Sequence, residues 1–176
     1  DENTSSIVKP HGGKLINQLS IVGKDSNIQK FVKTIELNLN QQSDLEQIAT
    51  GVYSPLKGFM TKTELKSVLE NMRLPDGTIF PLPILLDVNE ELIKNVKRGE
   101  IVGLLNLKKE LIGSIHVTEK FKFDKKVISK NVYGTVDKNH PGAKIIENLS
   151  DIFLAGEIKL FKMRNLDYTQ YQLTPK

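Results

Sequence analysis

Apolar residues recur at helical spacing in the first part of the chain. From Asn27 they follow the three-to-four-residue interval of an amphipathic helix, and Ser26 is placed to cap its first turn. The apolar positions are Ile28, Phe31, Val32 and Ile35. The pattern predicts a helix from Asn27, preceded over residues 1–27 by an extended arm that one proline and two glycines interrupt.

Two further helices carry clearer start signals. In SDLEQIATG, Ser43 and Glu46 have the spacing of a capping box, and Gly51 suits the C-terminal cap. In TKTELKSVLENM, Thr61 and Glu64 form a second capping box. The apolar sides of the two helices are expected to comprise Leu45, Ile48 and Ala49 in the first, and Leu65, Val68, Leu69 and Met72 in the second.

Strand signals gather in the second half of the chain. IFPLPILLDV follows a turn in LPDGT, but Pro81 and Pro83 restrict its early part to an edge or irregular strand. A hairpin turn in NLKKEL joins two of three further strands. These strands and two more helices are expected over 100–107, 110–117 and 155–163, and over 125–131 and 143–149. The pattern predicts an α+β fold, a small, partly open β-barrel or twisted sheet with surrounding short helices.

The segment GVYSPLKGFM, residues 51–60, is unusually apolar for a loop between two helices. Pro55 and Gly58 can shape a compact turn there. Only Tyr53 and Lys57 are titratable, which favours a structural role over a catalytic one. Its apolar side chains are expected to turn inward or toward a partner domain: Val52, Leu56, Phe59 and Met60.

The composition indicates one globular domain. The chain has 176 residues, 39% of them hydrophobic and 26% charged. No apolar stretch approaches the roughly 20 residues that span a bilayer, and no signal-peptide pattern is present, so a cytoplasmic protein without a membrane partner is expected. The absence of cysteine excludes disulfides and cysteine-ligated zinc, and with three histidines no metal site is expected.

The net charge of +4 permits attraction to phosphates. The basic clusters are short, however: Lys108 with Lys109, and the lysines between residues 120 and 126. Phe121 and Phe123 alternate with lysines, as in some nucleic-acid-binding strands, but an amphipathic strand with its phenylalanines in the core is the favoured interpretation. A solvated basic surface is likewise favoured over an RNA-binding patch.

Two histidine-containing segments are candidates for chemistry. His11-Gly12-Gly13 could present backbone N–H groups to an anion, but no strand-then-helix frame surrounds it, which favours a structural turn. Asp137 and His140 could bind a metal or transfer protons, but two ligands fall short of the usual three. The same residues suit a turn followed by a helix start, which is the favoured interpretation.

The remaining residues indicate no catalytic machinery. No serine lies in a nucleophile elbow, and no pair of carboxylates stands out from the scattered acids. His116, in an alternating strand, is interpreted as a surface residue or a core residue with its hydrogen bonds satisfied.

Three ordered stretches carry a resemblance to a known family. They are KPHGGKLINQL; ATGVYSPLKGFM with the following helix and ENMRLPDGTIFPLPILLDV; and VYGTVDKNHPG. From about Lys9 to Pro175 the chain resembles the amino-terminal region of ATP sulfurylases (sulfate adenylyltransferases). The resemblance implies a single PUA-like domain over 1–176. Its expected parts are an arm and helices over about 1–73, a strand-rich part over about 79–164 and the start of a connection over about 165–176.

The resemblance also implies the chemistry of the parent enzyme, the longer protein to which such a domain belongs. That enzyme transfers the adenylyl group of ATP to sulfate, giving adenosine 5′-phosphosulfate and pyrophosphate. A Rossmann-like nucleotidyltransferase domain carries the reaction, with a Gln-x-Arg-Asn-Pro stretch and a His-x-x-His motif. Neither occurs here, because Arg164-Asn165 is followed by Leu166 and lacks the preceding glutamine. We therefore expect an inactive accessory domain without catalytic, cofactor or metal residues, and ATP with magnesium bound by the parent's catalytic domain.

The partner implied by the resemblance is the carboxy-terminal catalytic domain of the parent, which is expected to be a homo-oligomer. Parts of SPLKGFM and HPG are expected near the seam between the two domains. The family-signature or interdomain candidates are His11, Gly12, Gly13, Ser54, Pro55, Leu56, Gly58, Phe59, Met60, Tyr133, Gly134, Asp137, His140, Pro141 and Gly142.

Two alternatives stay open at this point. The first is a stand-alone PUA-like module that binds RNA, a ligand class that the net charge of +4 suggests. The second is a purely architectural role in oligomer assembly. Nucleic acid is otherwise not expected as a partner.

Overall fold

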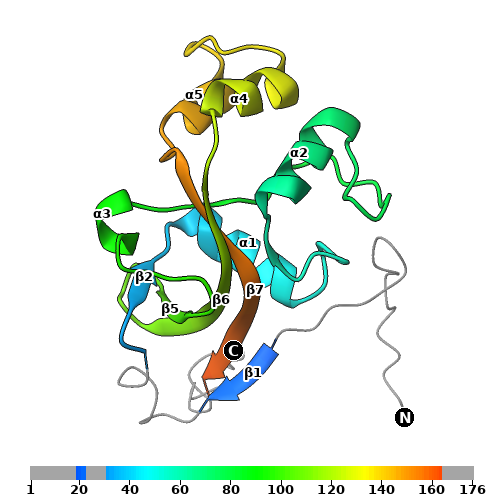
Figure 1. Cartoon of the computed structure of the whole chain (residues 1–176). Coiled ribbons are helices and arrows are strands. Elements are labelled where there is room, and N and C mark those ends of the chain that lie inside the picture. The colour runs from blue at the N-terminus through cyan, green and yellow to red at the C-terminus, as the bar shows by residue number, and fades with distance from the viewer. Residues whose placement is uncertain (1–18, 23–30, 164–176) are drawn as a thin grey trace, which may run out of the picture.

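Two twelve-residue strands, β6 (Leu111–Lys122) and β7 (Ile152–Met163), pair antiparallel and form the centre of the molecule (Figure 1). The computed structural model describes residues 19–22 and 31–163. Side chains of one β6 face, including Ile115 and Val117, are buried at the two-residue interval of a strand lying on a core.

Five shorter strands complete a single mixed sheet of seven strands. They are β1 (Leu19–Val22), β2 (Thr34–Glu36), β3 (Gly58–Phe59), β4 (Leu86–Asp87) and β5 (Ile101–Leu105). One edge of β7 pairs with β6, and β4, β3 and β1 follow one another along its other edge. On the far side of β6, β5 pairs antiparallel and β2 then pairs parallel with β5. Within the described residues β1 and β2 do not pair with each other, so the sheet stays open, as predicted.

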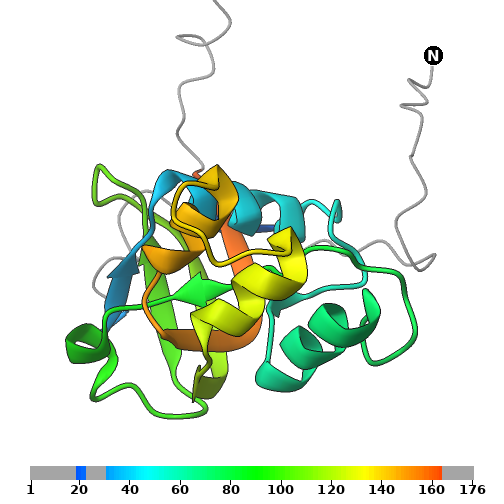
Figure 2. The same cartoon turned by 90° about the horizontal axis from the view of Figure 1, so that it is seen from above.

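Five short helices surround the sheet. They are α1 (Leu39–Ala49), α2 (Lys62–Asn71), α3 (Glu90–Ile93), α4 (Lys125–Tyr133) and α5 (Pro141–Glu147). The two helices between β6 and β7, α4 and α5, lie together at one end of the molecule (Figure 1). Seen from that end, they cross over the end of the sheet, and α2 lies beside α4 (Figure 2).

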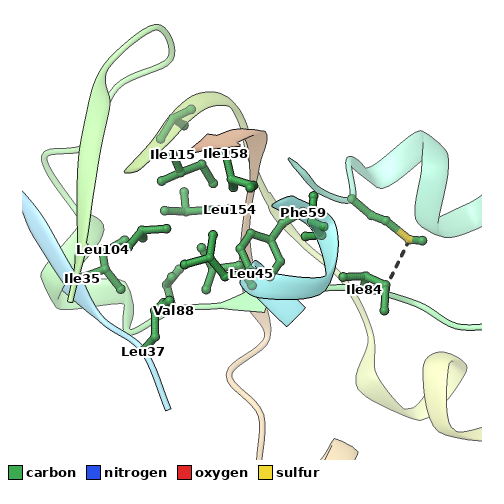
Figure 3. Packing of buried hydrophobic residues seen from close by; sticks show 14 of the residues in the cluster. Ile35, Leu37, Leu45, Phe59, Ile84, Val88, Leu104, Ile115, Leu154 and Ile158 are labelled. Atoms are coloured by element: carbon green, nitrogen blue, oxygen red, sulfur yellow. Dashed lines mark hydrogen bonds between the residues drawn. The ribbon is translucent and has the colours of Figure 1, made fainter. Parts of the chain in front are cut away.

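The apolar residues form two buried clusters. The larger one, which we call the main core, lies between the sheet, α1 and the loop after α1 (Figure 3), and its members include Ile35, Leu37, Leu45, Ile48, Phe59, Met60, Leu104, Ile115, Leu154 and Ile158. The second core lies under α2, α4 and α5 and comprises Leu65, Phe121, Ile128, Ile146, Phe153 and Ala155. Each fully buried side chain of this size contributes about 1.5–3 kcal/mol to folding, so both clusters matter for stability.

The predicted helix from Asn27 is wrong where it can be compared with the structure. Residues 23–30 lie outside the described part, and residues 34–36 form strand β2. Thr34–Glu36 pairs in parallel with Gly103–Leu105, and Ile35 is buried in the main core. The pairing partner is distant in sequence, so the helical spacing of these apolar residues carried no information about it.

The start of α1 also differs from the prediction. The helix begins four residues before Ser43, with Asn38 as its N-cap. The Gln41 backbone N–H donates to Asn38 Oδ1 (2.8 Å), and the Asn38 N–H donates to Gln41 Oε1 (3.0 Å). The predicted box of Ser43 and Glu46 is therefore wrong, because the first turn already has a complete box upstream.

The prediction for α2 is largely confirmed. Thr61 caps the helix, and the reciprocal bonds with Glu64 measure 3.1 and 3.0 Å. Leu65 and Val68 are buried as expected. Met72 is not part of this buried side, because it ends the helix in the left-handed conformation (φ 53°) and 60% of its surface is exposed.

The strands and helices of the second half are confirmed with shifted ends. LPDGT forms a turn in which the Leu74 N–H donates to the Thr78 carbonyl (2.8 Å), and of the following apolar run only Leu86–Asp87 is a strand. The NLKKEL hairpin joins β5 to β6, and β6 runs five residues beyond the predicted 117. The two last helices lie at 125–133 and 141–147.

Candidate functional site

The apolar loop 51–60 is built into the main core rather than spread over the surface. Gly51 follows α1 with φ 88°, the left-handed conformation that suits the C-terminal end of a helix. Leu56, Phe59 and Met60 are almost fully buried, whereas Val52 is 56% exposed. Three of the four apolar side chains thus turn inward as predicted, and Val52 alone points outward.

Hydrogen bonds fix the second half of this loop to two other segments. The Met60 N–H donates to the Ile84 carbonyl (3.0 Å), and the Ile158 N–H donates to the Lys57 carbonyl (3.1 Å). The Ile84 N–H lies 3.5 Å from Met60 Sδ (Figure 3). The loop is therefore held by strand β7 on one side and by the segment before β4 on the other.

A close backbone contact between two glycines explains why Gly58 stands in this loop. A Cβ atom on Gly58 would lie 1.7 Å from the carbonyl oxygen of Gly156 in β7. A Cβ on Gly156 would in turn lie 1.9 Å from the carbonyl oxygen of His116 in β6. The β6 strand bulges between Val117 and Glu119 at this point. Three chain segments are stacked there at a distance that only glycine permits.

On the outer side of the loop, residues 55–59, Thr61 and Glu64 line a hollow of about 260 Å³ together with Thr118, Gly156 and Glu157, which we call the loop hollow. Three of the polar groups around it have structural roles: Thr61 and Glu64 cap α2, and Thr118 Oγ1 donates to the Ala155 carbonyl (3.2 Å). Among the described residues that line it, no nucleophile stands beside a base.

A half-buried carboxylate lies next to the same loop. Burial raises the pKa of Asp44 in α1 to about 6. Burial also raises the pKa of Tyr53, and the negative charge of Asp44 adds to this effect. The Tyr53 ring packs edge-on against Phe80, with ring centroids 5.9 Å apart. No local sequence pattern marks Asp44, since its burial arises from packing between α1 and the loop.

The second signature segment, residues 133–142, is mostly exposed, and its residues hold α4 and α5 in place. Gly134 ends α4 with φ 71°, and the Tyr133 ring covers Gly142, where a Cβ would lie 2.5 Å from the ring. The Ser129 hydroxyl donates to the Thr135 carbonyl (2.6 Å). These contacts are local, because they join the end of one helix to the start of the next.

His140 and Asp137 have structural partners in this segment. His140 is the N-cap of α5, and its Nδ1 atom accepts from the backbone N–H groups of Gly142 (3.1 Å) and Ala143 (3.3 Å). Asp137 Oδ1 accepts from the Asn139 N–H (2.9 Å). Pro141 occupies the first turn of the helix, as its fixed φ allows. The favoured interpretation, a turn followed by a helix start, is confirmed, and no group of three potential metal ligands occurs in the described part of the chain.

The basic clusters do not form one continuous surface. Lys108 and Lys109 lie in the hairpin before β6, whereas Lys120 and Lys122 lie at the opposite end of this twelve-residue strand. Phe121 is buried and stacks on a core phenylalanine with ring centroids 5.5 Å apart. The amphipathic interpretation of this stretch is confirmed. His116 is exposed, in agreement with the interpretation as a surface residue.

Sequence reasoning missed one polar network. Asp87 Oδ1 accepts from Gln41 Nε2 (2.8 Å), and Asp87 Oδ2 accepts from the Ser150 N–H (3.1 Å). The three residues lie beside an acidic hollow of about 550 Å³ that Glu36 and Glu90 also line. No local pattern could have revealed this network, because its members are far apart in the chain.

The structure does not bring the two signature segments together. Residues 51–60 lie beside α1 and the middle of β7, whereas residues 133–142 lie around α4 and α5 at the end of the molecule (Figure 1). His11, Gly12 and Gly13 lie outside the described residues. No helix in the described part of the chain is long and apolar enough to cross a membrane.

Comparison with protein families gives one match along most of the chain. Residues 8–163 match the model of a family described as PUA-like domain. A solved structure of a hexameric APS kinase from Thiobacillus denitrificans is similar in fold, with a TM-score of 0.64 and 23% sequence identity over 96% of this chain and 30% of that one. At this identity the likeness concerns the fold alone.

Curated relatives named sulfate adenylyltransferase are more similar in sequence. The protein of Halothermothrix orenii is 37% identical over 174 residues, which is 96% of this chain and 45% of that relative. The proteins of Thermococcus onnurineus and a Synechococcus strain are 37% and 36% identical and are covered over 44% and 40% of their length. The chain therefore spans less than half the length of the curated relatives it matches.

Proposed function

This chain belongs to the PUA-like domain family, and from that premise we propose that it is the amino-terminal accessory domain of a sulfate adenylyltransferase. The parent enzyme would form adenosine 5′-phosphosulfate and pyrophosphate from ATP and sulfate. The chain's own role would be to support and bound the catalytic domain. Such a role can contribute to adenylyl transfer, because this reaction depends mainly on the positioning of the reactants and on electrostatic stabilisation.

The coverage of the relatives is the observation that carries this proposal. Nearly the whole chain, 96%, aligns with only 45% of the Halothermothrix orenii sulfate adenylyltransferase. The Gln-x-Arg-Asn-Pro and His-x-x-His motifs expected of the catalytic domain are absent from the sequence. Among the signature residues, Phe59 and Met60 fill the main core and His140 caps a helix. Together these facts favour an accessory domain over a self-sufficient enzyme.

The partners and ligands follow from the same proposal. The direct partner would be the catalytic domain of the parent, which would bind ATP with magnesium, and the parent would be a cytoplasmic homo-oligomer. The whole chain would be one domain, with an arm and helices over about 1–73, a strand-rich part over about 79–164 and the start of the connection over about 165–176.

The loop hollow is our candidate for the seam with the catalytic domain. Its backbone is fixed by hydrogen bonds to β7, so it offers a preformed surface. Val52 and Lys57 project from the same loop into solvent and could contact the partner. Of the second signature segment, His140, Pro141 and Gly142 are the candidates for this seam.

The activity of the isolated chain tests the proposal. The 176-residue protein is incubated with ATP, magnesium and sulfate, and pyrophosphate release is measured. The sulfate adenylyltransferase of Halothermothrix orenii, prepared in the same way, is the positive control. We expect turnover by the control and none by this chain. Formation of adenosine 5′-phosphosulfate by the chain at a rate comparable to the control would overturn the accessory role.

The reading frame after Lys176 tests the link to a parent enzyme. Sequencing the transcript downstream should reveal a continuous frame that encodes a Gln-x-Arg-Asn-Pro stretch and a His-x-x-His motif. A stop codon directly after Lys176 would contradict the proposal and favour a stand-alone module. RNA binding that weakens steeply with salt would then be the next property to measure.

A further inference from the structure

The pair of helices α4 and α5 encloses a second hollow, of about 320 Å³, which we call the helix-pair hollow. Its floor is formed by Ser129, Ala143 and Ile146, all of them buried, and Ser129 uses its hydroxyl on the Thr135 carbonyl. Val136, which is 53% exposed, forms one wall. The hollow is therefore apolar inside, and the one hydroxyl group on its floor already has a hydrogen-bond partner.

Lysine side chains dominate the rim of this hollow. Lys125, Lys126 and Lys138 line it together with the acids Asp124 and Glu147. Both acids have partners, since Asp124 caps α4 and Glu147 forms an exposed ion pair with Lys138 (3.1 Å). Lys125 donates to the backbone carbonyls of Glu147, the last residue of α5, and of Leu149 just after the helix. Lys126 is exposed, and its ammonium group has no partner among the described residues.

We propose that the helix-pair hollow is a docking site for a protein segment that places an apolar side chain next to a carboxylate. The apolar side chain would fill the space above Ala143 and Ile146. The carboxylate would pair with Lys126 and with Lys138, whose exposed ion pair with Glu147 is weak and easily exchanged. Protein interfaces commonly have an apolar centre surrounded by a polar, solvent-accessible rim, and a few anchors in pockets carry most of the binding energy.

The shape of the hollow favours a protein segment over other partners. Its volume of about 320 Å³ is at the lower limit of the roughly 300–1,000 Å³ typical of small-molecule sites, and it suits one or two side chains. Its apolar floor is recessed between the helices, whereas insertion into a membrane requires apolar groups that protrude. No aromatic ring lines the hollow in the described residues, so bases of RNA have no surface on which to stack. This inference does not depend on the proposed function.

Titration of the isotope-labelled 176-residue chain with short peptides tests the proposal. The probe is an acetylated and amidated hexapeptide with a leucine between two glutamates. Its matched controls carry lysines in place of the glutamates, or serine in place of the leucine. We expect saturable shifts of backbone amide signals over residues 124–147 with the probe, at millimolar affinity, and no saturable shifts with either control. The affinity should fall as salt is added.

Two substitutions locate the binding. Lys126→Glu should weaken binding of the probe about fivefold or more, because it reverses a rim charge. Lys130→Glu makes the same change on α4 outside the hollow and should leave the affinity nearly unchanged. Each variant is first compared with the parent chain in its amide spectrum, so that loss of fold is recognised.

Several results would overturn the proposal. They are the absence of saturable shifts, shifts outside residues 124–147, equal binding of the lysine peptide, or equal effects of the two substitutions. The last experiment measures co-sedimentation of the chain with vesicles of phosphatidylcholine and phosphatidylserine. We expect no binding there, and vesicle binding that Lys126→Glu removes would assign the face to a membrane instead.

Discussion

Segments 51–60 and 133–142 both carry specific sequence signatures, yet the structure uses them in opposite ways. In the first, Leu56, Phe59 and Met60 are buried in the main core and the backbone is hydrogen-bonded to distant segments. In the second, almost every residue is exposed and the contacts join neighbouring turns. A recognisable motif can therefore reflect either long-range packing or local turn geometry.

The difference matters for assigning function. Both segments contain residues that chemistry alone would make candidates, such as Tyr53 in the first and His140 in the second. Each residue has a structural task in this chain, since Tyr53 packs on Phe80 and His140 caps α5. These contacts account for the positions of both residues in the fold, and substitutions can measure how much each segment contributes to stability.

The largest effect is expected from Phe59→Ala. Phe59 is only 2% exposed in the main core, and removal of its ring should lower the free energy of unfolding by about 3–5 kcal/mol. Val52→Ala in the same loop is the control and should change it by less than about 0.5 kcal/mol, because Val52 is exposed. Urea unfolding followed by circular dichroism measures both. Equal losses for the two variants would refute the packing described for this loop.

The same substitution, glycine to alanine, can be made in both segments. Gly58→Ala places a methyl group 1.7 Å from the Gly156 carbonyl oxygen, and we expect a loss of about 1–3 kcal/mol or more as β3 separates from β7. At Gly134 an added methyl group would contact no other atom. Gly134→Ala should therefore lower the free energy of unfolding by only about 1 kcal/mol, because alanine is strained at a positive φ. Amide exchange should show the first variant opening β7 near residue 156. If Gly134→Ala were the more damaging variant, the assignment of long-range and local roles would be reversed.

A smaller effect is expected from His140→Ala. Loss of the Nδ1 acceptor leaves the first turn of α5 without its cap and should cost about 1 kcal/mol. His140→Asn is the matched variant, because an asparagine oxygen can accept the same bonds and should restore most of the stability. Thermal unfolding compares the three proteins. A loss that asparagine fails to restore would mean that His140 acts through some contact other than the cap.

The smallest effect concerns Asp44 beside the first loop. Its pKa of about 6 in the folded chain exceeds the ordinary 3.8, so the folded state holds the proton more tightly. The resulting stabilisation is complete below about pH 4 and is lost as the pH rises through about 6. Asp44→Asn should therefore flatten the pH dependence in this window and, near pH 7, stabilise the partly exposed site by less than about 1 kcal/mol. If urea titrations gave the same pH dependence of stability for Asp44→Asn as for the unsubstituted chain, the raised pKa of Asp44 would be contradicted.

Local signals were sufficient for several elements of the fold. The box of Thr61 and Glu64, the turn in LPDGT and the hairpin before β6 depend on residues a few positions apart, and all three form as predicted. The exposed turn before α5 was also predictable, because His140-Pro141 is a helix start that needs no distant partner. An N-cap such as Asn38 was missed because Ser43 offered a competing signal of equal quality.

The other elements of the fold and the candidate sites depend on contacts with segments far away in the chain. The spacing of residues within one segment does not reveal such contacts. Strands β3 and β4 have two residues each and exist only because β7 presents an edge to them. Residues 34–36 form a strand only because β5 lies alongside. The same holds for the candidate sites, since the loop hollow depends on a bulge in β6 opposite Gly156. None of these contacts leaves a periodic pattern in one segment.

The junction between β6 and the helix pair has a consequence for how such domains diversify. Lys122 pairs with Ile152, and the Phe123 N–H donates to the Asp151 carbonyl (3.1 Å), so the chain leaves the sheet and returns to it at one point. Everything between these residues is an insertion in a β-hairpin. Evolution can lengthen, replace or delete this inserted segment without changing the register of the strands, provided that other residues still bury the second core. A lineage can thus acquire a new binding lobe while it inherits the rest of the domain unchanged.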